Sequence, residues 1–209
     1  PNRHISFDLL NEPPDNGWKN TPGFTRERHH ALIRRTVAAI RAIHPDREIV
    51  IDGLSGGNVA IPELADLNVI QSCRGYAPYA LTHYRAPWAN KDIDSMPMPT
   101  WPLIEGKKRW NKDSLIDYYA PWRELEAMGV PVHVGEFGCF NQTPNDVALA
   151  WFADLLDVYR GFGWGYALWG FDYSFGIINH NRPGVRYQTV DGYSLDADLF
   201  DLYQAGRTD

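Results

Sequence analysis

Short apolar runs alternate with longer segments of helical periodicity along the whole sequence, and this alternation most limits what the chain can fold into. Nearly continuous apolar strands in strict alternation with helices are typical of a parallel sheet that helices cover. The pattern therefore predicts an α/β fold of five strand-then-helix units. The predicted strands lie within residues 4–10, 47–53, 67–73, 130–138 and 163–171.

The segments between these strands carry the start and stop signals of helices. Thr25 and Ser194 are suitable N-caps for the first and last helix, and Pro45 ends the first. Pro144 takes the favoured first position of the third helix. The predicted helices cover residues 25–44, 113–129, 145–161 and 195–205, and a shorter helical turn covers residues 61–66.

Periodicity alone leaves two architectures open, a doubly wound open sheet and part of a (β/α) barrel. The sequence has no low-complexity linker and no break in composition, so we expect a single domain over residues 1–209. The glycine-rich stretch at residues 53–58 lacks the spacing of a dinucleotide-binding loop and leads into no long helix. Dinucleotide binding is therefore not expected.

Charge and hydropathy narrow the classes of partner. The net charge of -6 argues against nucleic acids and anionic membrane surfaces, and no apolar run is long enough to cross a bilayer. The chain opens Pro-Asn-Arg-His without the apolar region of a signal peptide, which suggests the middle of something larger. Cys73 and Cys139 could form a disulfide, but two buried free thiols are favoured.

Tryptophan and tyrosine are abundant, with eight Trp and eleven Tyr, and many lie among Pro, Gly, Asn and Asp. Examples are Trp18, Trp88, Trp101 and Trp110. Aromatic rings in polar loops suit a cleft that stacks on flat apolar faces such as those of sugars. The alternative is that these rings pack beneath long loops.

Two carboxylates lie at the carboxyl ends of predicted strands, Glu12 at that of the first and Glu136 at that of the fourth. Ligands of parallel α/β folds bind at the carboxyl ends of the strands. Two carboxylates on one such edge can divide the roles of general acid and nucleophile. Either one alone would more often be an ordinary carboxylate paired with Arg or Lys, but together they favour catalysis.

Four stretches carry a family resemblance: FDLLNEPP from residue 7, RGYAPYALTHYRAPW from residue 74, VPVHVGEFGCFN from residue 130 and GWGYALWGFDYSFGI from residue 163. In this order they resemble the later strands of glycoside hydrolase family 5, the cellulase family. The resemblance implies a TIM barrel and a retaining endo-β-1,4-glucanase. It runs along essentially the whole chain and begins at the family's fourth barrel strand. We therefore expect a partial (β/α)8 barrel of about five βα units, equivalent to strands 4–8, with the first three strands absent.

The resemblance also implies site residues, and no metal or cofactor is required by a mechanism of two carboxylates. Glu12 would be the acid/base and Glu136 the nucleophile. Asn11 would bind the sugar 2-hydroxyl, Tyr76 would donate to the nucleophile, and Trp169 would lie under the scissile sugar. Further candidates for substrate binding are Arg74, His83, Trp88 and Trp18.

Two positions depart from the family pattern. Arg74 stands where a His is usual, and Gly170 stands where an Asn is common. Arg74 could be the cation that keeps Glu136 ionised, or it could pair elsewhere on the rim.

A five-stranded part of a barrel leaves two open edges, so we expect a homo-oligomer or a complementing chain that supplies the missing strands. The family resemblance implies a secreted enzyme acting on a β-glucan polysaccharide or oligosaccharide. The alternatives are an endo-β-mannanase and a non-catalytic glycan-binding or assembly subunit.

Overall fold

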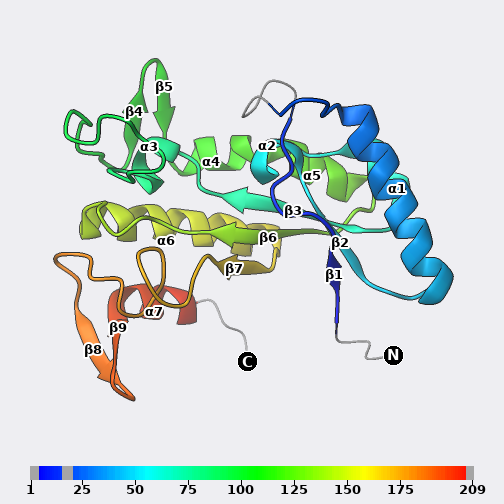
Figure 1. The fold of residues 1–209 in the computed structure, drawn as a ribbon. Coiled ribbons are helices and arrows are strands. Elements are labelled where there is room, and N and C mark those ends of the chain that lie inside the picture. Colours follow the sequence, from blue (N-terminus) through cyan, green and yellow to red (C-terminus); the bar gives the residue numbers. More distant parts are fainter. Residues whose placement is uncertain (1–4, 16–20, 206–209) are drawn as a thin grey trace. The chain divides into compact units, whose positions relative to one another are not determined.

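The computed structural model describes residues 5–15 and 21–205, and its main sheet has five parallel strands in chain order, β1-β2-β3-β6-β7 (Figure 1). The register pairs Phe7 with Ile49 and Val50 with Ile70. Consecutive neighbours in one parallel sheet are what repeated βα units produce. The predicted partial (β/α)8 barrel is therefore confirmed. The strands are β1 (Phe7–Asp8), β2 (Ile49–Asp52), β3 (Ile70–Gly75), β6 (Val132–Phe137) and β7 (Tyr166–Leu168).

The contacts within the chain divide it into two compact units. Unit 1 comprises Pro1–Arg74 and Tyr119–Gly135, and unit 2 comprises Gly75–Tyr118 and Glu136–Asp209. Unit 1 holds β1 and β2, and unit 2 holds β7.

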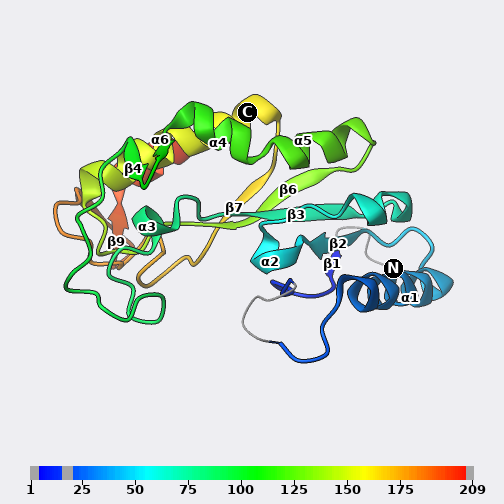
Figure 2. The same cartoon turned by 90° about the horizontal axis from the view of Figure 1, so that it is seen from above.

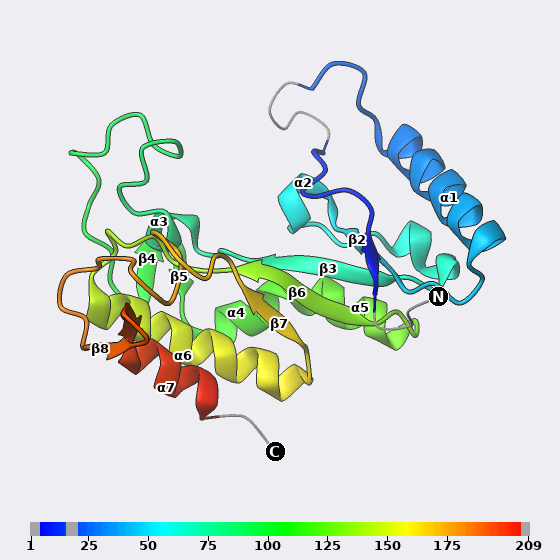
Figure 3. The same ribbon diagram turned by 60° about the horizontal axis from the view of Figure 1, so that its bottom comes forward.

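Helix α6 (Asn145–Phe162) is the longest helix of unit 2 and follows the prediction closely. Pro144 is its N-cap and not its first helical residue, and Gly163 ends it in the left-handed conformation at φ 73°. Helix α4 (Lys112–Tyr118) lies along α6 (Figure 2). Helix α7 (Ala197–Gln204) also packs on α6 (Figure 3).

The sequence analysis missed two hairpins and a short helix in unit 2. The hairpins pair β4 (Leu103–Glu105) with β5 (Lys108–Trp110), and β8 (Tyr187–Val190) with β9 (Tyr193–Asp196), and the helix is α3 (Tyr79–Thr82). The predicted Ser194 cap is wrong because Ser194 lies within β9. Asp196 caps α7 instead, accepting a hydrogen bond of 2.9 Å from the Leu199 N–H.

The predicted helix over residues 113–129 is wrong as a single element. It is divided into α4 and α5 (Ala120–Ala127), with Tyr119 between them. Pro121 in the first turn of α5 has no N–H to continue a preceding helix, and its ring disfavours helical backbone at the residue before it.

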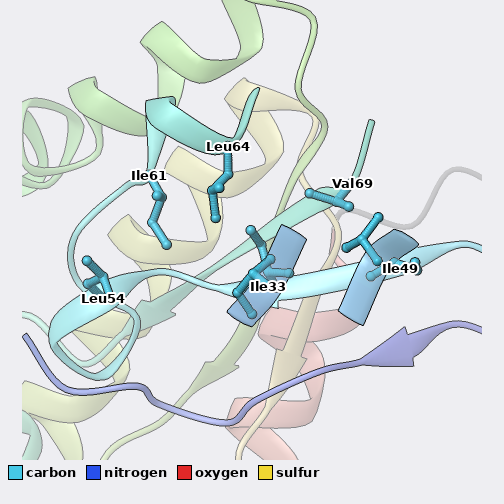
Figure 4. Close-up of a cluster of buried hydrophobic side chains, with 8 residues drawn as sticks. Ile33, Ile49, Leu54, Ile61, Leu64 and Val69 are labelled. Atoms are coloured by element: carbon cyan, nitrogen blue, oxygen red, sulfur yellow. The ribbon is translucent and has the colours of Figure 1, made fainter. Parts of the chain in front are cut away.

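The core of unit 1 joins the first long helix to the sheet. Helix α1 (Arg26–Ile43) begins after Thr25, whose hydroxyl accepts the Arg28 N–H at 3.2 Å as an N-cap. The other helical elements here are α2 (Leu54–Gly57) and the 3-10 helix η2 (Pro62–Leu67). The packing of α1 on β2 and η2 holds β2 in place, and Asp52 is the last residue of this strand. The buried cluster contains Ile33, Ile49, Leu54, Ile61, Leu64 and Val69 (Figure 4).

Both cysteines, Cys73 and Cys139, are free and buried, which confirms the favoured alternative of the sequence analysis. Burial raises the pKa of each thiol. Within the described part of the chain, no helix combines the length and the apolar character needed to span a bilayer.

Candidate active site

In unit 1, the segment after β1 presents Asn11 and Glu12 on a fixed backbone. Glu12 has a left-handed conformation with φ 48°, which is uncommon for a residue other than glycine. Its backbone N–H donates a hydrogen bond of 2.8 Å to Oδ2 of Asp52 at the end of β2. The Gly56 N–H donates to the Pro13 carbonyl at 3.0 Å, which ties down the next residue as well. The Glu12 side chain stays 34% exposed and thus open to a ligand.

Arg74 is the centre of the polar contacts in unit 1, and its side chain is only 2% exposed. Its guanidinium forms two hydrogen bonds to the Asp52 carboxylate, of 2.9 and 2.5 Å. It also donates to Asn11 Oδ1 at 2.8 Å and to Glu12 Oε1 at 3.4 Å. Arg74 thus links the two predicted site residues of unit 1 to one buried carboxylate. Its predicted influence on Glu136 stays a prediction.

The Arg74 side chain fills a space that two glycines leave open. A Cβ at Gly57 would lie 2.5 Å from Cγ of Arg74, and one at Gly135 would lie 2.8 Å from Nη1. Both distances are shorter than carbon and nitrogen atoms tolerate without displacement. Gly57 also has φ 77°, so glycine is favoured there by the backbone as well.

In unit 2, Tyr76 and Glu136 are brought together. The Tyr76 hydroxyl donates to Oε2 of Glu136 at 3.1 Å. Tyr76 follows the last residue of β3, and Glu136 lies in β6, one residue before its end. The edges of the Tyr76 ring contact His83 and Phe175, with ring centres 5.4 and 6.1 Å away. A phenol donor on a carboxylate favours the ionised form of that carboxylate.

His83 is buried beside this pair and has no acidic partner in the described contacts. Its ring stacks on Tyr79 at 3.8 Å, and its Nδ1 lies 3.0 Å from the Thr82 hydroxyl. Burial lowers the pKa of His83 to about 4, so the ring is neutral at neutral pH. His83 therefore offers hydrogen bonding without charge.

Two predicted aromatic residues expose their rings in unit 2. Trp88 is 62% exposed and packs edge-on against Phe140, with ring centres 4.9 Å apart. Trp169 is 51% exposed, and its backbone N–H donates to the Phe137 carbonyl at 2.7 Å, next to Glu136. Such rings, exposed but held at one side, can stack on sugars. Trp18 lies outside the described residues.

Sequence reasoning missed Asp52 as a member of the site. The only signal was a carboxylate at the end of the apolar run IVID, and the residues it binds are distant in sequence. In the described ranges, no cluster of three or more His, Cys, Asp or Glu side chains could hold a metal ion. The chemistry available from the described residues is that of carboxyl groups held by hydrogen-bond donors, as glycoside hydrolysis requires.

Comparisons with known proteins agree with this chemistry. A family model, Cellulase (glycosyl hydrolase family 5), matches residues 1–173. A solved glycoside hydrolase is 55% identical with a TM-score of 0.89, and the match covers 97% of this chain and 61% of that one. A comparison with curated proteins gave no match.

Two more distant solved structures share the fold. Cel5A of Thermotoga maritima, in complex with mannotriose, is 22% identical with a TM-score of 0.71, covering 94% of this chain and 58% of that one. Cellulose synthase subunit Z of Clostridioides difficile is 20% identical with a TM-score of 0.72, covering 94% and 60%. The chain thus spans about three fifths of the length of these solved structures. On the family match and the 55% identity, this chain belongs to glycoside hydrolase family 5, the cellulase family.

Proposed function

We propose that the chain is one catalytic domain, over residues 1–209, of a retaining endo-β-1,4-glucanase. Glu136 is the nucleophile and Glu12 the acid/base in this proposal. The observation that carries it is the hydrogen bond from Tyr76 to Glu136, because it holds a carboxyl group at a strand end in a chain of this family. The exposed Trp88 and Trp169 support a glycan as the ligand.

The reaction runs in two displacements. In the first, Glu136 Oε1 or Oε2 attacks the anomeric carbon while the glycosidic C–O bond breaks, and Glu12 gives its proton to the departing oxygen. In the second, Glu12 takes a proton from water, and that water displaces Glu136 from the anomeric carbon. Two inversions restore the β configuration.

Asn11 and Arg74 act together in substrate binding. Since Arg74 occupies Oδ1 of Asn11 at 2.8 Å, the orientation of the amide is set and its NH2 group can donate to a sugar hydroxyl. Trp169 and Trp88 supply stacking surfaces, and neutral His83 adds a polar edge beside Tyr76.

A β-1,4-glucan is the first substrate candidate, because the matching family model is that of cellulases. A β-1,4-mannan is the second, because a structural neighbour was solved with mannotriose. We propose secretion for the same family reason, since cellulose-like polymers lie outside the cell.

We infer that a second copy of the chain covers the edge of the sheet at β1. Strand β1 pairs only with β2 among the described strands. Three apolar residues in or beside β1 are exposed, Ile5 at 49%, Phe7 at 38% and Leu10 at 40%. An exposed apolar strand edge is a template for pairing with another chain, and closed symmetry makes an identical partner the default.

The test is hydrolysis by the purified chain of a soluble cellulose derivative and, in parallel, of a soluble mannan. We expect reducing ends to appear with at least one polymer and to be lost in Glu136→Gln. Glu124→Gln, on the exposed face of α5, is the matched control and should be as active as the unaltered chain. Binding of either polymer without any hydrolysis would favour the non-catalytic alternative.

A further inference from the structure

We propose that Asp52 is a positioning residue for Glu12: it fixes the backbone of Glu12 directly and the carboxyl group of Glu12 through Arg74. The inference rests on the proposed function for the role of Glu12 as acid/base. Asp52 has no place in the two displacements themselves.

Asp52 holds the backbone conformation of Glu12. Glu12 adopts φ 48°, a backbone conformation that residues other than glycine rarely take, so it needs an external contact to stay there. The 2.8 Å hydrogen bond from its N–H to Asp52 Oδ2 is such a contact. Asp52 is itself 1% exposed at the end of the four-residue strand β2, so the acceptor cannot move to follow Glu12.

Asp52 also positions the side chain of Glu12, through Arg74. The same Asp52 carboxylate takes two hydrogen bonds from Arg74, which fixes the plane of the guanidinium. The remaining Arg74 donors then point at Ser72 Oγ, Asn11 Oδ1 and Glu12 Oε1, at 3.0, 2.8 and 3.4 Å. One carboxylate thus sets both the backbone and the side-chain oxygen of Glu12.

Asp52 also changes the net charge that lies beside Glu12. A lone guanidinium beside Glu12 would favour the ionised carboxylate and oppose proton delivery. Asp52 balances the charge of Arg74, so Glu12 faces a neutral pair. Among the described residues, the other titratable groups that interact with this pair include Asp8 on β1, Cys73 on β3 and His133 on β6.

The ion pair of Asp52 and Arg74 is buried, and its burial supports a role beyond stability. Replacing a buried ion pair by apolar residues is often neutral or stabilising, so stability alone does not account for it. Here the chain also provides Gly57 and Gly135 where any Cβ would collide with Arg74. The chain thus leaves room for Arg74 at Gly57, and for Arg74 together with Ser72 at Gly135, and this space supports a role for the Arg74 side chain in holding Glu12.

The test uses Asp52→Asn, which keeps the size of the side chain and an acceptor for the Glu12 N–H but removes the charge. We compare cello-oligosaccharides, whose leaving group is poor, with an activated dinitrophenyl cellobioside. Removing general-acid help costs about 10²-fold or more when the leaving group is basic, so we expect that loss on oligosaccharides and little loss in the first turnover of the activated substrate. In Glu12→Gln/Asp52→Asn, we expect no loss beyond that of Glu12→Gln alone.

The control is Asp196→Asn, a buried carboxylate that caps α7 and binds His180 at 3.0 Å in unit 2. It should lower stability but affect both substrates equally. Equal losses on both substrates for Asp52→Asn, or a further loss in the double variant, would overturn the proposal.

A second measurement does not depend on hydrolysis. The Glu12 amide should exchange its hydrogen slowly in the unaltered chain and about tenfold faster in Asp52→Ala, while amides of α6 keep their rates. An unchanged exchange rate of the Glu12 amide would refute the role of Asp52 in fixing the Glu12 backbone. A chain that hydrolyses nothing would refute the proposed function and leave this measurement to decide on Asp52.

Discussion

The hydroxyl of Tyr76 donates a hydrogen bond to Oε2 of Glu136 over 3.1 Å. Both residues lie where strands of the parallel sheet end, Tyr76 just after β3 and Glu136 in β6. The contact uses one oxygen of the carboxylate, Oε2. A carboxyl group held in this way has a fixed orientation, which the proposed role of Glu136 as nucleophile needs.

Tyr76→Phe removes that hydrogen bond, while the ring contacts with His83 and Phe175 stay possible. We expect kcat/KM to fall by about 10- to 100-fold, the range for one hydrogen bond to a charged group. Tyr203→Phe is the control, since the buried Tyr203 hydroxyl has no hydrogen-bond partner in the described part of the chain. Equal activity of the two variants would show that Tyr76 does not serve the nucleophile.

Glu12→Gln should separate substrates by their leaving groups. Without a proton donor, the first displacement stalls when the departing oxygen is basic and proceeds when it is a stabilised phenolate. We expect hydrolysis of cello-oligosaccharides to drop about 10²-fold or more, while release of dinitrophenolate in the first turnover persists. Steady-state and burst measurements with both substrates check this. The same loss on both would assign Glu12 a structural role.

His29 should make the folded state less stable in acid. Burial, with the nearby His30 adding to it, lowers the pKa of His29 from 6.5 to about 4. Between these values the unfolded chain binds a proton that the folded chain does not, so stability falls as the pH drops from about 6.5 to 4. One such group contributes on the order of 2 kcal/mol across that range.

The measurement is urea unfolding at pH 7 and pH 4.5 for the unaltered chain and His29→Phe. The variant has no proton to gain at this position, so its stability should fall less between the two pH values. Equal falls would show that His29 already carries its proton in the folded chain at pH 4.5.

Association follows from the uncovered edge at β1. A strand edge with Phe7 at 38% exposure and Ile5 at 49% should be covered in a soluble particle. We expect light scattering to give a mass above that of one chain, and the mass to fall only on strong dilution. Phe7→Lys, which places a charge on this edge, should shift the equilibrium toward single chains. A compact monomer at all concentrations would reject this inference.

The sequence was sufficient for the elements whose signals are local. Apolar periodicity and caps placed β2, α1 and α6 because each depends on residues within a few positions of one another. The hairpins were missed because their strands are three or four residues long, too short for a periodicity. Their turns at Gly106 and at Asp191-Gly192, all with positive φ, were a usable signal.

The candidate site was predictable where a motif names the residue and not where a partner must be found in space. Glu12, Glu136 and Tyr76 come from such motifs. Asp52 was not found, because it acts on residues 22 and 40 positions away and nothing local marks it. Arg74 departs from the family pattern, which marks it in the sequence, but its partner Asp52 is visible only in the structure.

The most direct test of the account is to trap the covalent intermediate. A 2-fluoro cellobioside with a good leaving group forms the glycosyl-enzyme but slows its hydrolysis, since fluorine at C2 disfavours the second displacement's transition state. Mass spectrometry of the digested protein should then find one added 2-fluorocellobiosyl group, on the peptide that contains Glu136, and none in Glu136→Gln. A sugar on any other residue, or hydrolysis of the natural polymer with inversion at the anomeric carbon, would contradict the assignment of Glu136 as the nucleophile.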